Sequence, residues 1–218
     1  MASATRSGKV EVAPAILVKD RQSLLAAINT VKRFTPLIHI DIMDNKFVPN
    51  STISVSELTS IPDGVGYEIH WMVENPAELI PRVSGRHLHI VHIEAVRDRW
   101  RAVEAAVKKA GGGLGLAFNP ETPVEAVLPF IGRVERVLVM AVHPGFSGQR
   151  YIKEVEAKIA WLRKRFPRLD IEVDGGIDFA TAASAVKAGA NILASASTIF
   201  KSPEPGEAIA RLKNAGRE

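Results

Sequence analysis

The order of apolar segments constrains the fold more than any other feature of this sequence. Short apolar runs, typical of buried strands, alternate eight times with longer amphipathic runs, typical of helices. The strand-like runs occupy residues 10–17, 37–43, 66–73, 88–95, 113–120, 136–145, 170–176 and 191–197. Helical patterns follow at residues 22–34, 55–60, 75–83, 97–111, 122–131, 151–166, 178–189 and 205–214. Strict alternation predicts an α/β protein with a parallel sheet. Eight such units predict a closed (β/α)8 TIM barrel.

The main alternative is an open, doubly wound sheet, which needs a glycine-rich phosphate-binding turn directly after its first strand. The glycine cluster GGGLGL at residues 111–116 instead precedes a strand, which predicts a helix C-cap and a turn. No linker or low-complexity segment interrupts the alternation. We therefore expect residues 1–218 to form a single barrel domain, with residues 1–9 as a short flexible N-terminus.

The composition limits which kinds of molecule the protein is expected to bind. The 218 residues are 46% hydrophobic and 24% charged, which is typical of a globular protein. The formal charge of +4 is scattered without a basic run, so we expect no nucleic-acid partner. No apolar stretch approaches the roughly 20 residues of a membrane span, and the first ten residues have no apolar core of a secretory signal. We expect a cytoplasmic protein without a membrane partner. Cysteine is absent, so any metal must be bound by His, Asp, Glu or water.

Polar side chains occupy one face of the second strand-like run. His39 and Asp41 are two residues apart and share a face, whereas the isoleucines between them take the other. In a barrel the aliphatic face packs against the helices and the other face points to the axis. His70 and Asp174 lie at the inward-facing ends of two further strands. Two imidazoles and two carboxylates suit one divalent cation, Zn²⁺, Fe²⁺, Mn²⁺ or Co²⁺.

Two further sets of residues lie at the same end of the predicted barrel, where its strands end. Met43, Met72 and Met140 fall at strand ends, either as core filling or as an apolar floor around a charged intermediate. Small-residue loops follow strands six, seven and eight, and loops of this kind bind phosphate through backbone N–H groups. The candidate residues in these loops are Gly145, Phe146, Ser147, Gly148, Gly175, Gly176, Ala196 and Ser197.

The remaining histidines are less informative. His92 faces inward near the end of strand four together with Glu94, and either contacts substrate or is a core histidine with satisfied hydrogen bonds. We expect His87 and His89, at the start of that strand, to be structural. His143 begins the loop after strand six, and the sequence assigns it no role.

The same segments resemble the ribulose-phosphate 3-epimerase family. The matching blocks span residues 13–200 in the family's order: APAIL, HIDIMDNKFVPN, HWMVENP, HIEA, LAFNPETP, VLVMAVHPGFSGQ, EVDGGI and GANILASASTIF. The resemblance implies a ribulose-phosphate-binding type of barrel and a homo-oligomer that acts on a small sugar phosphate. It also implies that His39, Asp41, His70 and Asp174 hold the metal and that Asp41 and Asp174 transfer the proton.

The implied reaction interconverts D-ribulose 5-phosphate and D-xylulose 5-phosphate. It would proceed by two-base proton transfer through a metal-stabilised enediolate, because inversion requires one carboxyl on each face of a planar intermediate. His70 and the three methionines would also contact the substrate.

The chain departs from the family's pattern at residues around the substrate. Ala15 stands where the family usually has serine, and Ser147 and Ala196 stand at usual glycines. If Ala196 needed a positive φ, its backbone would be strained. These departures leave open a 3-epimerase of another ketose phosphate, such as a six-carbon one. A metal-free barrel of the same superfamily and a non-catalytic sugar-phosphate binder are further alternatives.

Overall fold

The structure, a computed structural model, describes residues 10–58 and 60–216, so the expectation for residues 1–9 lies outside the described residues. Eight parallel strands pair in chain order, and β1 pairs with β8 to close the barrel. They are β1 (Glu11–Ile16), β2 (Leu37–Met43), β3 (Gly66–Met72), β4 (Leu88–His92), β5 (Gly113–Phe118), β6 (Arg136–Met140), β7 (Asp170–Asp174) and β8 (Ile192–Ser195). The predicted TIM barrel is confirmed, and the open-sheet alternative is wrong.

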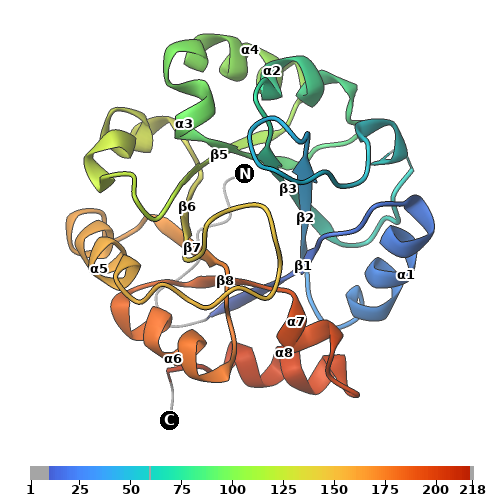
Figure 1. Cartoon of the computed structure of the whole chain (residues 1–218), viewed down its shortest axis with the longest axis vertical. Coiled ribbons are helices and arrows are strands. Elements are labelled where there is room, and N and C mark those ends of the chain that lie inside the picture. The colour runs from blue at the N-terminus through green and yellow to red at the C-terminus, as the bar shows by residue number, and fades with distance from the viewer. Residues whose placement is uncertain (1–9, 59, 217–218) are drawn as a thin grey trace.

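Helical segments surround the strands (Figure 1). The longer α-helices are α1 (Arg21–Val31), α4 (Trp100–Ala110), α5 (Val155–Arg165), α6 (Phe179–Ala188) and α8 (Pro205–Lys213). The shorter segments are η1 (Val55–Leu58), α2 (Pro76–Leu79), η2 (Ile80–Arg82), α3 (Ile93–Val96), η3 (Arg97–Arg99), η4 (Val124–Arg133) and α7 (Ser197–Phe200). The predicted cap after α4 is confirmed, because Gly111 takes a left-handed conformation with φ of 73° there.

The segment after β5 differs from the α-helix that its pattern predicts. Its residues form the 3₁₀ helix η4, which contains Pro129. A proline has no N–H to donate and its ring clashes with the carbonyl four residues earlier, so a regular α-helix is disfavoured. The apolar residues of η4 still pack against the barrel, since Val124, Val127 and Ile131 are buried.

The two faces of β2 show how the sequence positions a site. Ile38, Ile40 and Ile42 belong to the large apolar cluster that includes residues of the outer helices. His39 and Asp41 occupy the opposite, inward face. In the register of β2 with β3, His39 lies opposite Glu68 and Asp41 opposite His70. Adjacent strands therefore bring their inward side chains together inside the barrel.

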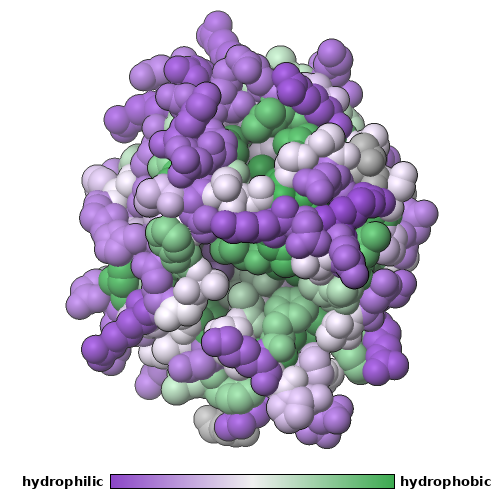
Figure 2. Space-filling model, turned by 45° about the vertical axis from the view of Figure 1, so that its right-hand side comes forward, coloured by the Kyte–Doolittle hydropathy of each residue, from purple (hydrophilic) through white to green (hydrophobic). Residues whose placement is uncertain are grey.

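The outer surface is mainly polar. Figure 2 shows one side of the molecule covered mostly by hydrophilic residues, with hydrophobic residues visible between them. Phe146 and Trp161 are the exposed large hydrophobic side chains of the described part of the chain. Among the same residues, no helix is both long and apolar enough to cross a bilayer.

Candidate active site at the mouth of the barrel

Four side chains from three strands meet at the carboxyl end of the barrel. His39 and Asp41 come from β2, His70 comes from β3 and Asp174 ends β7. Asp41 Oδ1 lies 3.2 Å from His39 Nε2 and 3.0 Å from His70 Nδ1. Asp174 Oδ2 lies 3.9 Å from His70 Nδ1. One ligand atom from each of the four residues lies within 4.8 Å of the other three. The structure thus brings together all four residues that the sequence nominated.

This group has the chemistry of a divalent metal site. Ligand atoms at about 2.0–2.2 Å from one cation are themselves roughly 3–4 Å apart, which matches the separations seen here. The two imidazoles are fully buried, and two carboxylates converge on them. Imidazole and carboxylate ligands suit Zn²⁺, Fe²⁺, Mn²⁺ and Co²⁺. The residues present therefore fit such a cation.

The two carboxyl groups have different proton affinities. Burial alone would raise the pKa of Asp41, but the charge of His39 and the hydrogen bonds from His39 and His70 lower it below its usual range. Burial, followed by the negative charge of Asp41, raises the pKa of Asp174 to about 7. One carboxyl group thus favours its ionised form, whereas the other keeps its proton to higher pH. Such a pair is suited to general acid–base chemistry.

The surroundings of His39 favour its protonated form. Burial would lower the pKa of its imidazole, yet Asp41 and the neighbouring glutamates outweigh burial and raise this pKa well above its ordinary value. A proton on His39 therefore offsets the carboxylate charge in the position where a cation would do so.

A charged cluster beneath the site was not predicted from the sequence. His39 Nδ1 lies 2.7 Å from Glu68 Oε1 and 3.3 Å from Glu172 Oε1. Arg136 pairs with both glutamates through Nη1, at 3.0 Å from Glu172 Oε2. Burial raises the pKa of Glu68 to about 8, whereas at Glu172 the Arg136 guanidinium outweighs burial and lowers the pKa. Strand alternation could have found both glutamates, because each lies two residues before a predicted ligand.

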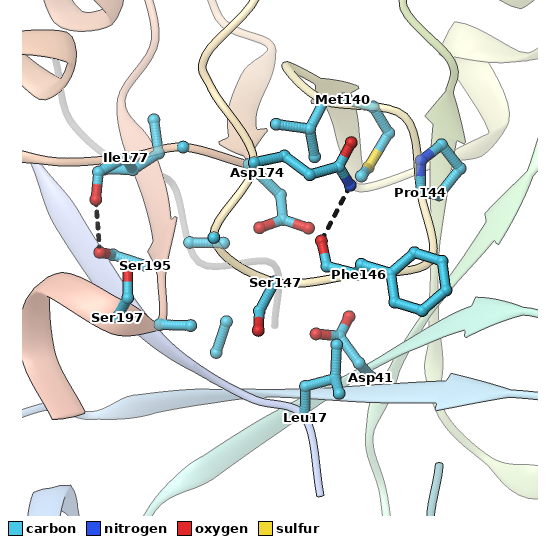
Figure 3. A pocket seen from close by; sticks show the side chains of 18 of the residues that line it. Leu17, Asp41, Met140, Pro144, Phe146, Ser147, Asp174, Ile177, Ser195 and Ser197 are labelled. Carbon is cyan, nitrogen blue, oxygen red and sulfur yellow. Dashed lines mark hydrogen bonds between the residues drawn. The ribbon is translucent and has the colours of Figure 1, made fainter. Parts of the chain in front are cut away.

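A cavity of about 190 Å³ opens above the carboxyl groups. In Figure 3 the carboxyl groups of Asp41 and Asp174 project into it from different sides. Its lining includes every predicted substrate contact except His70, which lies buried beneath it. Those lining residues are Met43, Met72, Met140, Gly145, Phe146, Ser147, Gly148, Gly175, Gly176, Ala196 and Ser197.

Sequence reasoning missed other lining residues, which follow strand ends or neighbour the predicted ones. They are Leu17, Val142, Pro144, Gln149, Ile177, Asp178, Ala194, Ser195 and Thr198. The rule that all the loops after barrel strands build the site would have nominated Leu17. Ala15 also lines the cavity.

Hydrogen bonds fix the loops around the cavity. Gln149 Nε2 donates to the carbonyl oxygens of His143, at 2.6 Å, and Phe146, at 2.9 Å. Asn50 Nδ2, from the loop after β2, donates to Gly145 O at 2.7 Å. These side chains hold the loop after β6 in one conformation and tie it to the loop after β2.

The loop after β7 is held from the β8 side. Ser195 Oγ and Thr198 Oγ1 donate to Ile177 O at 2.9 and 2.7 Å, and Figure 3 shows the Ser195 bond. Gly176 has φ of 64°, and a Cβ there would lie 2.6 Å from the backbone nitrogen of Tyr151, so glycine is required on two counts.

The structure also describes the histidines without a predicted role and the alanine that stands at a usual glycine of the family. Ala196 has φ of −103°, so the backbone strain considered for alanine is absent. His143 is exposed and pairs with Glu121 at 3.0 Å. His92 is buried and does not line the cavity.

Comparison with known proteins gives consistent results. Residues 11–200 match the model of the ribulose-phosphate 3 epimerase family. The cytoplasmic isoform of ribulose-phosphate 3-epimerase from Oryza sativa subsp. japonica is 38% identical over 213 residues, covering 94% of this chain and 93% of the relative. Ribulose-phosphate 3-epimerase from Bacillus subtilis is 34% identical over 220 residues, covering 94% of this chain and 99% of the relative.

A solved structure shares the fold. The crystal structure of 3-hexulose-6-phosphate synthase from Salmonella typhimurium superimposes with a TM-score of 0.69 at 13% sequence identity. The match covers 94% of this chain and 97% of that protein.

Proposed function

Because the chain belongs to the ribulose-phosphate 3-epimerase family, we propose that it is a metal-dependent enzyme that interconverts D-ribulose 5-phosphate and D-xylulose 5-phosphate. The observation that carries this proposal is the pair of carboxyl groups, Asp41 and Asp174, that face one cavity with their pKa values shifted in opposite directions. Inverting one carbon requires a base on one face and an acid on the other, and this pair supplies both.

The residues of the site would divide the proton transfer between them. In one direction, ionised Asp41 removes the proton from the carbon next to the substrate ketone. Protonated Asp174 then delivers a proton to the opposite face. In the reverse direction the two carboxyl groups exchange roles. Met43, Met72 and Met140 line the cavity and provide an apolar floor that keeps bulk water from the reacting carbon.

His39, Asp41, His70 and Asp174 would hold a single divalent cation, Zn²⁺, Fe²⁺, Mn²⁺ or Co²⁺. When bound, the cation would offset the negative charge that develops on the substrate oxygens. The substrate phosphate would lie against the loops after β6, β7 and β8. Backbone N–H groups of Gly148, Gly176 and Ser197 are the proposed donors, since all three residues line the cavity.

Ala15 supports one alternative within the same reaction type. Its methyl group lines the cavity beside His39 in the register of β1 and β2, in a position where a hydroxyl would bind a sugar oxygen. A six-carbon ketose phosphate is therefore a second candidate substrate. Epimerisation of five- and six-carbon ketose 5- and 6-phosphates, followed by NMR, distinguishes the two. A higher kcat/KM for ribulose 5-phosphate supports the first proposal, and a preference for the six-carbon substrate overturns it.

We also propose a single-domain, cytoplasmic protein that forms a homo-oligomer. The rice relative is named a cytoplasmic isoform, which supports the compartment.

A further inference from the structure

A chain of hydrogen-bonding side chains runs from the candidate metal site into the barrel wall. Asp41 Oδ1 lies 3.0 Å from His70 Nδ1, and His70 Nε2 lies 2.8 Å from His92 Nε2. His92 Nδ1 in turn lies 3.3 Å from Glu94 Oε2. Asp41 lies in β2, His70 in β3, His92 at the end of β4 and Glu94 in α3, so this series of hydrogen bonds joins four elements. Both imidazoles are fully buried.

Glu94 is fixed as an acceptor at the outer end of this chain. Its Oε1 accepts hydrogen bonds from the backbone N–H of Asn119, at 2.8 Å, and from the hydroxyl of Thr122. An ionised carboxylate only accepts hydrogen bonds, so the nitrogen of His92 that faces it must carry a proton. The Phe47 ring packs on His92 with centroids 4.9 Å apart and restricts rotation of the imidazole.

The proton on His92 Nδ1 determines which ring nitrogens carry protons in the rest of this series of hydrogen bonds. A neutral imidazole with a proton on Nδ1 has a lone pair on Nε2. Two bare nitrogens 2.8 Å apart would repel, so His70 must donate from its own Nε2. With a cation in the site, that leaves the lone pair of His70 on Nδ1, the atom that faces Asp41 and Asp174. The opposite direction of donation would place a proton on Nδ1 and block a cation there.

We propose that Glu94 and His92 are positioning residues that hold His70 in the Nε2–H tautomer, with the Nδ1 lone pair directed at the metal site. This inference rests on the proposed metal-dependent function. It assigns a role to two residues that do not line the cavity. Carboxylates that orient a metal-binding histidine through hydrogen bonds raise metal affinity in other proteins.

The tautomers can be measured directly. Long-range ¹H–¹⁵N NMR spectra of protein labelled with ¹⁵N-histidine, at pH 7.5, report which nitrogen of each ring carries the proton. His92→Gln and His70→Gln assign the signals. In the zinc-loaded protein we expect His92 to carry its proton on Nδ1 and His70 to carry its proton on Nε2. A proton on Nε2 of His92 in the zinc-loaded protein, alone or together with Nδ1, overturns the proposal.

Zinc affinity tests the consequence without using activity. We expect His92→Phe to raise the zinc dissociation constant about 10- to 100-fold, measured by competition with a chelating dye. His92→Gln can present an amide oxygen near the position of Nε2 and should retain most of the affinity. His89→Phe is the matched control, because His89 is equally buried on β4 but faces Trp71 on the outer side of the barrel. Its zinc affinity should be unchanged.

The possible results separate the positioning role of His92 and Glu94 from the metal site itself. Equal losses in His92→Phe and His89→Phe would overturn the positioning role in favour of general loosening. If His92→Phe does not fold, Glu94→Leu replaces it, since this residue is partly exposed. Glu94→Leu should then weaken zinc binding and leave a mixture of His92 tautomers, and wild-type affinity with a single tautomer would overturn the role. A wild-type protein that binds no zinc would refute the metal site itself.

Discussion

At the scale of single residues, the candidate site contains two aspartates whose pKa values are shifted in opposite directions. The two histidines lower the pKa of Asp41, whereas burial and the charge of Asp41 raise the pKa of Asp174. The sequence predicted both residues because strand alternation shows which side chains face inward. It could not predict the pKa difference, since this depends on distances between side chains from strands far apart in the chain.

Replacing Asp174 tests its role in proton transfer. Asp174→Asn keeps the shape of the side chain but removes the proton donor and acceptor, so we expect turnover to fall by about 10²- to 10⁴-fold. Circular dichroism should show an intact fold. Asp44→Asn is the control, because Asp44 lies just beyond β2 and its carboxylate hydrogen-bonds backbone N–H groups of its own loop and of Glu74. Full activity of Asp174→Asn would reject the assignment.

The raised pKa of Asp174 predicts how metal binding depends on pH. A metal competes with the proton for Asp174, so metal binding displaces proton from this carboxyl group where the metal-free protein holds it. With a pKa of about 7, Asp174 is mostly protonated at pH 6 and mostly ionised at pH 8. Binding of Mn²⁺ should therefore release more protons at pH 6 than at pH 8, by up to about 0.8 of a proton. Calorimetry in buffers of different ionisation enthalpy measures this release, and equal release at both pH values would contradict the expected pKa.

At the scale of elements, three of the barrel strands each contribute to two layers of one polar interior. β2, β3 and β7 carry the candidate ligands Asp41, His70 and Asp174 at their ends, and the fourth candidate ligand, His39, lies one layer deeper beside Glu68 and Glu172. The sequence revealed the first layer because it stands at strand ends, where barrel sites are expected. The deeper layer follows from the same alternation, but the partner of the two glutamates, Arg136, lies 68 residues from Glu68. Only the closed barrel brings them together.

Arg136 should therefore be essential for stability. Arg136→Met leaves Glu68 and Glu172 buried without their counter-ion, and we expect a loss of about 3–5 kcal/mol in the free energy of unfolding. Arg133→Met is the matched control, because Arg133 pairs with Glu104 at the surface, with 48% of its side chain exposed. Exposed pairs contribute about 0–1 kcal/mol. Urea denaturation measures both, and equal effects would show that the buried cluster does not stabilise the barrel.

At the scale of the whole molecule, the sequence predicted the barrel and the rim on which the site lies. Alternation of apolar runs was sufficient, because eight strand–helix units have few other ways to bury their apolar faces. The sequence did not predict that η4 would be a 3₁₀ helix, nor the conformation of Ala196, whose φ of −103° is set by the junction of β8 and α7. Both depend on how a short segment fits between elements that are already fixed.

The central claim is that His39, Asp41, His70 and Asp174 form one metal-dependent site for proton transfer. Uptake of deuterium from solvent into ribulose 5-phosphate, followed by NMR with metal-loaded and chelator-treated protein, tests it most directly. We expect deuterium at the carbon next to the ketone in the loaded protein, loss of that exchange after chelation, and recovery when Mn²⁺ or Zn²⁺ is restored. Exchange that persists undiminished in metal-free protein, or its absence from loaded protein, would contradict the claim.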